Sequence, residues 1–204
     1  EKTFAVCWYG VYFGCRVFMP MLLNSEEGHI INTSSVNGFW ASLGPGIAHT
    51  SYSAAKFAVK GFSEALINDL RINAPHLSVS VVMPGHIGTS IALNSTAAHG
   101  GPDLERIRKT LAERGTDVDQ MSDADLTELV VSRGERFRDD APTTAAEAAA
   151  IILDGVREKR WRILVGDDAI VLDELVREDP EFAYEPEFLQ RIVERGHLNY
   201  FDSR

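Results

Sequence analysis

The amino-acid sequence predicts an α/β fold in which helices cover both faces of a doubly wound parallel sheet. Short segments rich in β-branched residues alternate with longer segments of helical periodicity, and the first two strand-like segments end in small or polar residues. Strands that alternate with helices form parallel sheets with right-handed crossovers. In such sheets ligands bind beyond the carboxyl ends of the strands, so we expect functional residues there.

The chain opens with a segment, residues 3–23, that is apolar nearly all round and is expected to form a buried helix. Its first unbroken apolar run, residues 4–15, covers 12 residues and is too short to cross a bilayer. No basic leader or small-residue cleavage site precedes it. We therefore expect neither a membrane span nor a signal peptide.

The later elements are predicted from β-branched content, helical periodicity and breaking residues. They are a strand over 29–35, a Gly/Ser-rich loop over 36–50, a helix over 51–74, a strand over 77–85, a helix over 143–159, a strand over 160–166, a helix over 168–178 and an aromatic tail that includes Tyr200 and Phe201.

Residues 86–142 are polar and acidic, with short helical patterns and no strand signal. We expect them to form a mostly helical insertion before the last strand. The whole chain, 1–204, is then one domain with three parts: a catalytic half over 1–85, the insertion over 86–142 as a substrate lid, and a last helix, strand and tail over 143–204.

The composition describes a soluble globular protein, with 45% hydrophobic and 25% charged residues among 204. A net charge of −10 argues against a nucleic-acid partner, because phosphate backbones attract basic surfaces. Cys7 and Cys15 would lie about 12 Å apart along a helix, too far for a disulfide. Free thiols favour a reducing, cytoplasmic location. No His, Cys or carboxylate cluster has metal-ligand spacing, so no metal is expected.

The segment HTSYSAAKFAVKGF, residues 49–62, holds Tyr52 and Lys56 one helical turn apart. Their side chains therefore leave the same face of the helix. The pair by itself also fits a structural interpretation, in which the Tyr52 ring packs and Lys56 extends to solvent. The neighbouring motifs distinguish the two interpretations.

Three motifs in this order resemble the short-chain dehydrogenase/reductase family. IINTSSVNG resembles the strand that ends in the family's catalytic serine, YSAAK resembles its Tyr-x-x-x-Lys motif, and VVMPGHIGTSI resembles its Pro-Gly segment with a threonine a few residues on. The resemblance covers about residues 1–95 and, more loosely, 143–166. It implies a Rossmann-like sheet and NAD or NADP as the cofactor.

The resemblance also implies the roles of single residues. Tyr52 would be the acid/base of hydride transfer, and Lys56 would stabilise its phenolate and hold the ribose hydroxyls. Ser35 would bond the substrate oxygen; it is preferred to Ser34 because the family's serine is the second of such a pair and only one of the two can face the cleft.

The same resemblance gives the expected binding residues, in which the Pro-Gly pair lets the backbone pass close to the nicotinamide. The expected cofactor-binding residues are Tyr52, Lys56, Pro84, Gly85, Ile87 and Thr89. The expected substrate-binding residues are Ser35, Phe39, Trp40, His86 and Ile91. The apolar members of the second set favour a small, hydrophobic alcohol or ketone.

Two features depart from the family pattern. Cys7 stands where the family usually has an asparagine that helps to hold a water in the proton relay, and a thiol is a weak hydrogen-bonding group. The family's glycine-rich turn and the N-terminal half that contains it are expected to be absent from this chain. The sheet would then be incomplete and these residues alone would be inactive.

The expected function is an NAD(P)-dependent oxidoreductase that interconverts a hydroxyl and a ketone. One alternative is a sugar-nucleotide epimerase or dehydratase, which shares the Tyr-x-x-x-Lys motif. Another is a catalytically impaired or non-enzymatic homologue. The family further implies a homodimer or homotetramer through helices 3–23 and 51–74, where Phe13 and Phe57 belong to a surplus of apolar residues.

Overall fold

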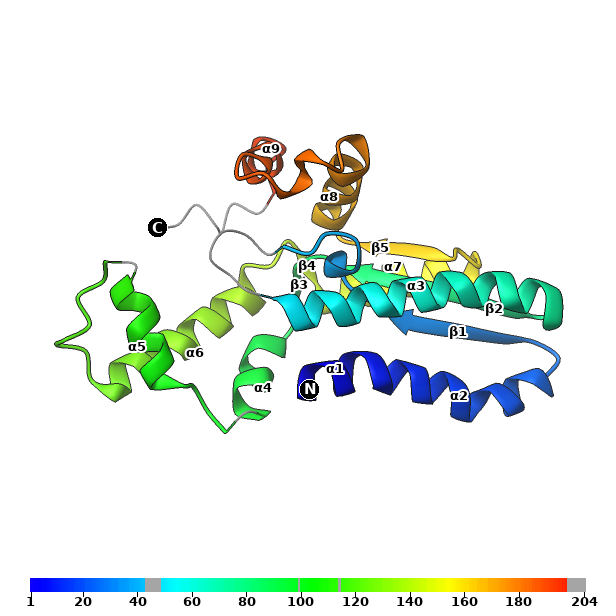
Figure 1. Ribbon diagram of the computed structural model, residues 1–204, viewed down its shortest axis with the longest axis horizontal. Helices are drawn as coiled ribbons and strands as arrows, with labels where there is room; N and C mark the ends of the chain where they lie inside the picture. The colour runs from blue at the N-terminus through cyan, green and yellow to red at the C-terminus, as the bar shows by residue number, and fades with distance from the viewer. Residues whose placement is uncertain (43–48, 99, 114, 198–204) are drawn as a thin grey trace. The chain divides into compact units, whose positions relative to one another are not determined.

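The computed structural model describes residues 1–42, 49–98, 100–113 and 115–197 (Figure 1). It divides the chain into two compact units, one of Glu1–His86 with Ala146–Arg204 and one of Ile87–Ala145. The second unit covers nearly the same residues as the predicted insertion over 86–142. The role of this insertion as a substrate lid and the single domain over 1–204 stay predictions. Part of the predicted Gly/Ser-rich loop (43–48), Tyr200 and Phe201 lie outside the described residues.

The first unit contains a parallel three-stranded sheet in the order β1-β2-β5, which confirms the predicted fold class. Its strands are β1 (Gly28–Thr33), β2 (Leu77–Pro84) and β5 (Arg162–Val165). Beyond the ends of the strands, the Ser34 N–H donates to the Val82 carbonyl at 2.8 Å, and the Gly85 N–H donates to the Val165 carbonyl at 3.0 Å. The segments that follow the three strands therefore meet at one edge, which we call the carboxyl edge.

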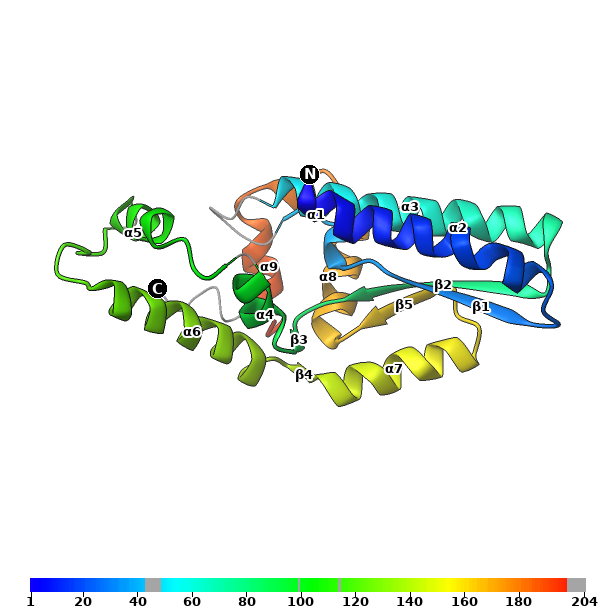
Figure 2. The same cartoon turned by 90° about the horizontal axis from the view of Figure 1, so that it is seen from below.

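Helices cover both faces of this sheet (Figures 1 and 2). On one face α2 (Gly10–Leu23) and α3 (Thr50–Asn73) lie side by side, and on the other lies α7 (Ala145–Arg157). Gly155 lets α7 approach the sheet, because a Cβ there would overlap the Ile163 side chain. The core between α2, α3 and the sheet is apolar; its buried members are Cys15, Ile30, Leu66, Leu70, Ala74, Leu77 and Val79.

The N-terminal helix is far more exposed than the sequence predicts. It runs through α1 (Lys2–Phe4), a π-helical turn η1 (Ala5–Tyr9) and α2, and Cys15 is its only buried residue. The prediction of a buried helix is therefore wrong for this structure. Among the described residues β1 pairs only with β2, so the sheet and α3 cover one side of the helix only.

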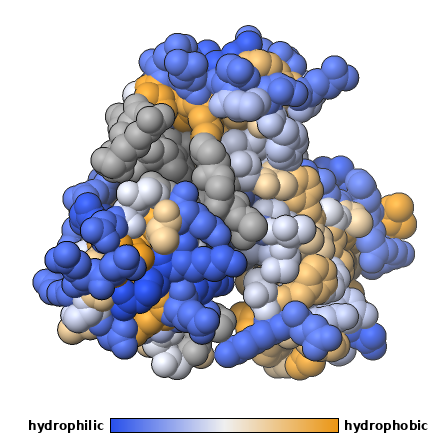
Figure 3. Space-filling view, turned by 60° about the vertical axis from the view of Figure 1, so that its left-hand side comes forward, coloured by the Kyte–Doolittle hydropathy of each residue, from blue (hydrophilic) through white to orange (hydrophobic). Residues whose placement is uncertain are grey.

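The exposed side of this helix is apolar. Val17 is 68% exposed and Phe13 is 56% exposed, and apolar side chains reach the surface on the face drawn in Figure 3. A groove of about 660 Å³ lies between the helix and β1. By length and composition, the helix Lys2–Leu23 could span a membrane. A single helix of this kind near the N-terminus is weak evidence for a membrane span, because a signal sequence or the core helix of a soluble protein passes the same test. The absence of a membrane span stays a prediction.

The second unit is helical, as predicted for the insertion. It contains α4 (Ile91–Ala98), α5 (Leu104–Glu113) and α6 (Asp123–Asp139), and its core is formed by Leu111, Val118 and Leu126 with partly buried neighbours. Two short strands, β3 (Ile87–Gly88) and β4 (Thr143–Thr144), pair in parallel where the unit begins and ends.

These two short strands correct the prediction at both ends of the insertion. The sequence shows no strand signal within residues 86–142, where β3 lies, and the helix predicted from residue 143 begins at Ala145. Thr143 and Thr144 pair with β3, and the helix predicted from residue 143 starts directly after this pairing.

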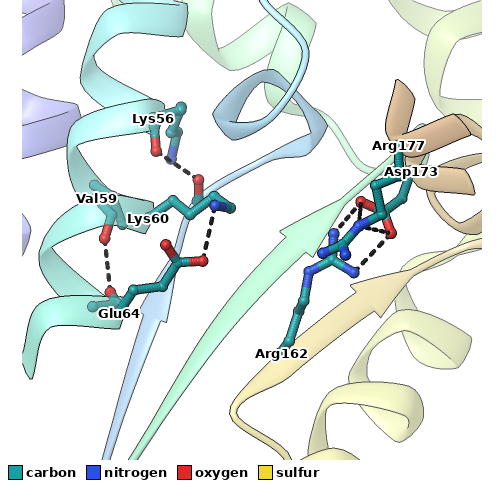
Figure 4. Close-up of polar contacts among 9 residues, drawn as sticks. Lys56, Val59, Lys60, Glu64, Arg162, Asp173 and Arg177 are labelled. Atoms are coloured by element: carbon teal, nitrogen blue, oxygen red, sulfur yellow. Dashed lines mark hydrogen bonds and ion pairs between the residues drawn. The ribbon is translucent and has the colours of Figure 1, made fainter. Parts of the chain in front are cut away.

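The C-terminal part of the first unit adds α8 (Asp167–Glu178), η3 (Phe182–Tyr184) and α9 (Phe188–Glu194). These pack with the short η2 (Val36–Gly38) into a second apolar core. A buried ion pair joins β5 to α8, because Arg162 Nη1 donates to Asp173 Oδ2 at 2.7 Å (Figure 4). Arg177 on the next turn of α8 also contacts Asp173, at 3.1 Å.

Candidate active site

The two serines after β1 have different partners, as strand alternation predicts. Ser34 is buried and its Oγ donates to the backbone carbonyl of Lys56 at 2.8 Å, which ties the end of β1 to α3. The Ser35 side chain is hydrogen bonded to the side chain of Tyr52 and also accepts from the Asn37 N–H at 3.2 Å. Ser35 is therefore the serine that meets the tyrosine, and Ser34 has a structural partner.

Tyr52 lies in the first turn of α3, where helix geometry presents it toward Ser35. Burial raises the pKa of its phenol, the hydrogen bond with Ser35 lowers that pKa, and the nearby Cys7 thiol raises it. The net pKa lies above the ordinary value of 10.0. The phenol is consequently protonated at neutral pH and is a proton donor in this state.

Lys56 lies one turn after Tyr52 on the same face of α3, and its Nζ is 5.6 Å from the centroid of the Tyr52 ring. The ammonium donates to the backbone carbonyl of Thr33 at the end of β1, at 3.0 Å (Figure 4). Burial lowers the pKa of Lys56, and the electrostatic influence of Cys7 opposes this. Lys56 is thus directed at the carboxyl edge instead of extending to solvent.

Cys7 faces the same site from the N-terminal helix, since it acts electrostatically on both Tyr52 and Lys56. It lies in the π-helical turn η1, which packs against α3. Single π-helical turns occur frequently at functional sites because they widen the helix locally. Cys7, the thiol that stands in place of the family's asparagine, therefore lies near Tyr52 and Lys56.

The Pro84–Gly85 pair ends β2 at the same edge, and a residue that the sequence analysis missed lies directly against it. Asp168, in the first turn of α8, accepts a hydrogen bond from the His86 N–H at 2.6 Å. Both the carboxylate and His86 are buried. The available signal was the pair of acidic residues after Gly166, which follows the last strand and begins a helix.

Two predicted substrate residues, Phe39 and Trp40, lie in the second apolar core. Trp40 is 2% exposed and its Nε1–H donates to the Ala183 carbonyl at 2.6 Å, so the indole cannot line an open substrate wall in this structure. Phe39 is partly buried against the same core, with the Arg162 guanidinium 5.8 Å from its ring centroid. The local sequence around Phe39 and Trp40 does not indicate that α8 and α9 cover these two side chains.

The remaining predicted residues, Ile87, Thr89 and Ile91, belong to the second unit. Their roles toward cofactor and substrate stay predictions. No group of three or more His, Cys, Asp or Glu side chains that could hold a metal ion occurs in the part of the chain that the structure describes.

The residues at the carboxyl edge fit a nicotinamide nucleotide in their chemistry. An ammonium group has three N–H donors, and the bond from Lys56 to Thr33 uses one, so the group has further donors for ribose hydroxyls. Ser35 and Tyr52 share a hydrogen bond, and each hydroxyl has one O–H donor, so both can donate to one substrate oxygen once that oxygen replaces their shared bond. Such an arrangement can transfer a proton and stabilise charge on that oxygen.

Comparison with known proteins agrees with this geometry. Residues 1–100 match the family model of short chain dehydrogenases. A Mycobacterium tuberculosis protein named as an oxidoreductase, SadH, is 32% identical over 201 residues, which is 98% of this chain and 60% of that protein. The 3-ketodihydrosphingosine reductase of Bacteroides thetaiotaomicron is 37% identical over 87 residues, 43% of this chain and 30% of that enzyme.

Solved structures give the same fold. A short-chain dehydrogenase/reductase from Burkholderia phymatum in complex with NAD superimposes with a TM-score of 0.63 and 26% identity, over 90% of this chain and 59% of that one. A short-chain dehydrogenase from Burkholderia cenocepacia in complex with NADP gives 0.58 at 20% identity, over 91% and 57%, and shows the fold alone. The described sheet is thus Rossmann-like.

The chain spans 60% of the length of SadH, its curated relative. The family match lies at the N-terminal end of the chain, over residues 1–100. It therefore gives no support to the expectation that the N-terminal half of the family is absent.

Proposed function

We propose that the protein is an NAD(P)-dependent oxidoreductase of the short-chain dehydrogenase family that interconverts a hydroxyl and a ketone, because residues 1–100 match the model of that family. The observation that carries the proposal is the hydrogen bond between Ser35 and Tyr52, with Lys56 one turn further along the same face of α3. The solved short-chain dehydrogenase/reductase in complex with NAD, at 26% identity, supports a nicotinamide cofactor.

In this proposal the bound nicotinamide supplies the hydride in reduction and accepts it in oxidation. Tyr52 donates its phenolic proton to the carbonyl oxygen of a ketone, and Ser35 hydrogen bonds the same oxygen as it gains negative charge. Lys56 holds the ribose through N–H donors and stabilises the phenolate that remains. In oxidation the same groups act in reverse, and the phenolate accepts the hydroxyl proton.

The substrate proposed is a small, hydrophobic alcohol or ketone. Its binding residues are predicted to be Ser35, His86 and Ile91. Phe39 and Trp40 are left out of this set because they pack in the second apolar core. The two free thiols, Cys7 and Cys15, fit the proposed cytoplasmic location.

The variant Lys56→Ala in the full-length protein tests the cofactor half of this proposal. We expect the Kd for NADH or NADPH to rise at least about tenfold, because the ribose loses charge-assisted hydrogen bonds. Lys60→Ala is the matched control, since Lys60 lies one turn later and pairs with Glu64 at 2.8 Å (Figure 4). If the wild-type protein bound neither cofactor in a fluorescence titration, the proposed function would be wrong.

A second candidate, a catalytically impaired homologue, is favoured by one observation, the Cys7 thiol beside Tyr52 and Lys56. We expect Cys7→Asn to leave kcat unchanged or to raise it, because an amide is a better hydrogen-bonding group than a thiol. Steady-state kinetics with both cofactors measures this. Absent turnover in the wild type, restored by Cys7→Asn, would favour the impaired homologue, whereas a large loss in a folded Cys7→Asn variant would give the thiol a role of its own.

A further inference from the structure

Asp168 is a buried carboxylate that the proposed function does not use. It is 5% exposed and lies in the first turn of α8, which begins directly after Gly166 at the end of β5. It therefore belongs to the carboxyl edge, with Ser35 and the Pro84–Gly85 pair. Burying an ionisable group costs desolvation free energy unless polar partners offset it. The contacts of Asp168 therefore indicate what its burial achieves.

The contacts of Asp168 run to the segment after β2. Its Oδ2 accepts from the His86 N–H at 2.6 Å, and the Ala169 N–H also donates to the carboxylate. Its Oδ1 is buried and makes no hydrogen bond within the described residues. Two histidines act on it electrostatically, His86 from the end of β2 and His197 from the segment after α9. Burial nevertheless raises its pKa above the ordinary carboxyl value.

The same carboxylate determines which residue fits at position 85. A Cβ at Gly85 would overlap both carboxylate oxygens and the Cγ of Asp168, and these are the three heavy atoms nearest to it. The φ of Gly85 does not lie in the positive range, so its backbone conformation does not require a glycine. The resemblance explains this glycine by close approach of the nicotinamide, whereas the structure gives a cause inside the protein.

We propose that Asp168 is a positioning residue for the cofactor-binding segment, because its carboxylate occupies the place of a side chain at Gly85 and fixes the Gly85–His86 backbone against α8. The proposal rests on the proposed function in one respect, that this segment binds the nicotinamide. Asp168 acts through the backbone, so its loss lets the segment shift while the Ser35–Tyr52 bond stays intact. The Kd for the cofactor should therefore rise because the segment is displaced, and not because Asp168 itself loses a contact with the cofactor.

A double-substitution cycle tests the steric part of the proposal. In the full-length protein, Gly85→Ala should raise the Kd for NADH and NADPH more than about tenfold, because the new methyl group displaces the carboxylate. Adding Asp168→Ala removes the overlapping atoms, so the double variant should bind no more weakly than Asp168→Ala alone. If the rise in Kd of the double variant equalled the product of the rises in the two single variants, the proposal would be overturned.

Conservative substitution tests the hydrogen bond. Asp168→Asn keeps a carbonyl oxygen for the His86 N–H and should bind cofactor within about threefold of wild type, whereas Asp168→Ala should lose about tenfold. Asp167→Ala is the control, since Asp167 is exposed in the same first turn of α8. A lowered Tm with an unchanged Kd in Asp168→Ala would show a merely structural carboxylate and overturn the proposal.

Hydrogen exchange separates this proposal from the proposed function. The His86 amide should be protected in the wild type and in Asp168→Asn, and should exchange faster in Asp168→Ala, with or without cofactor. If the wild type bound no cofactor, the proposed function would fail while this exchange pattern could still hold. Equal protection in all three proteins would remove the hydrogen bond on which the positioning depends and would overturn the proposal.

Discussion

Polar and apolar side chains are distributed in opposite ways in two regions of the first unit, the carboxyl edge and the outer side of α2. At the carboxyl edge the polar side chains are bonded within the protein: the buried Ser34 to Lys56, the half-buried Lys56 to Thr33, and the buried Asp168 to His86. On the outer side of α2, by contrast, apolar side chains are exposed. Stability alone favours the reverse, with apolar groups inside and ionisable groups in water.

This contrast shows that each region is arranged for something other than its own stability. Buried ionisable groups with shifted pKa values at the end of a parallel sheet are typical of a small-molecule site. A continuous exposed apolar surface is typical of a site for another protein surface. We propose, as the family implies, that α2 and α3 form the contact of a homodimer or homotetramer.

The largest effect on stability is expected from breaking a buried charge pair. Asp173→Ala should lower the free energy of unfolding by about 3–5 kcal/mol, because it leaves the largely buried Arg162 without its carboxylate. Glu64→Ala is the contrasting control; its pair with Lys60 is 38% exposed on the glutamate side and should contribute less than about 1 kcal/mol. Chemical denaturation at neutral pH compares the two.

The pH dependence of the free energy of unfolding gives a second test of the Arg162–Asp173 pair. Burial alone would raise the pKa of Asp173, but the hydrogen bonds and charges of Arg162 and Arg177 hold it below the ordinary 3.8. The pair therefore stabilises the fold above that pH, and the stabilisation is lost as the pH falls through the lowered pKa. Equal losses in Asp173→Ala and Glu64→Ala at neutral pH would contradict the distinction between buried and exposed polar groups.

A smaller effect on stability is expected on the exposed apolar side. Val17→Lys should change the free energy of unfolding of a subunit by less than about 0.5 kcal/mol, because the side chain is 68% exposed. The same change should dissociate a dimer that buries this surface, which light scattering detects. Val131→Lys in α6 is the control, since it changes an exposed valine outside α2 and α3. A wild-type protein that is monomeric at micromolar concentration would contradict the proposed assembly.

The sequence predicted what local patterns can encode. The strand before Ser34 and Ser35 and the helix carrying Tyr52 and Lys56 are confirmed, although the strand ends at Thr33, because hydrophobic periodicity and breaking residues determine them directly. The choice of Ser35 agrees with its hydrogen bond to Tyr52. Its catalytic role, however, stays a prediction.

Features that depend on distant partners could not be predicted in this way. Trp40 is covered by Ala183, 143 positions later, and Asp168 meets His86 across 82 positions. The exposure of residues 3–23 depends on which surfaces pack against the helix, and an apolar sequence cannot specify that. The pairing of Thr143 and Thr144 with β3 likewise joins distant parts of the chain.

We propose that Tyr52 transfers the proton, and the variant Tyr52→Phe removes only the oxygen that would do so. The ring and its packing remain, so cofactor binding and folding should stay close to wild type, while kcat should fall by about 10²–10⁴-fold. Tyr9→Phe, which changes an exposed tyrosine on the N-terminal helix, should leave kcat unchanged. In the wild type, reduction should slow as the pH rises through the Tyr52 pKa, because the proton donor is lost.

The measurement is the steady-state rate of ketone reduction by the full-length protein, with and without the phenolic oxygen of Tyr52. We expect a near-complete loss of turnover with an unchanged Kd for the cofactor. A Tyr52→Phe enzyme that kept most of its activity would contradict this proposal.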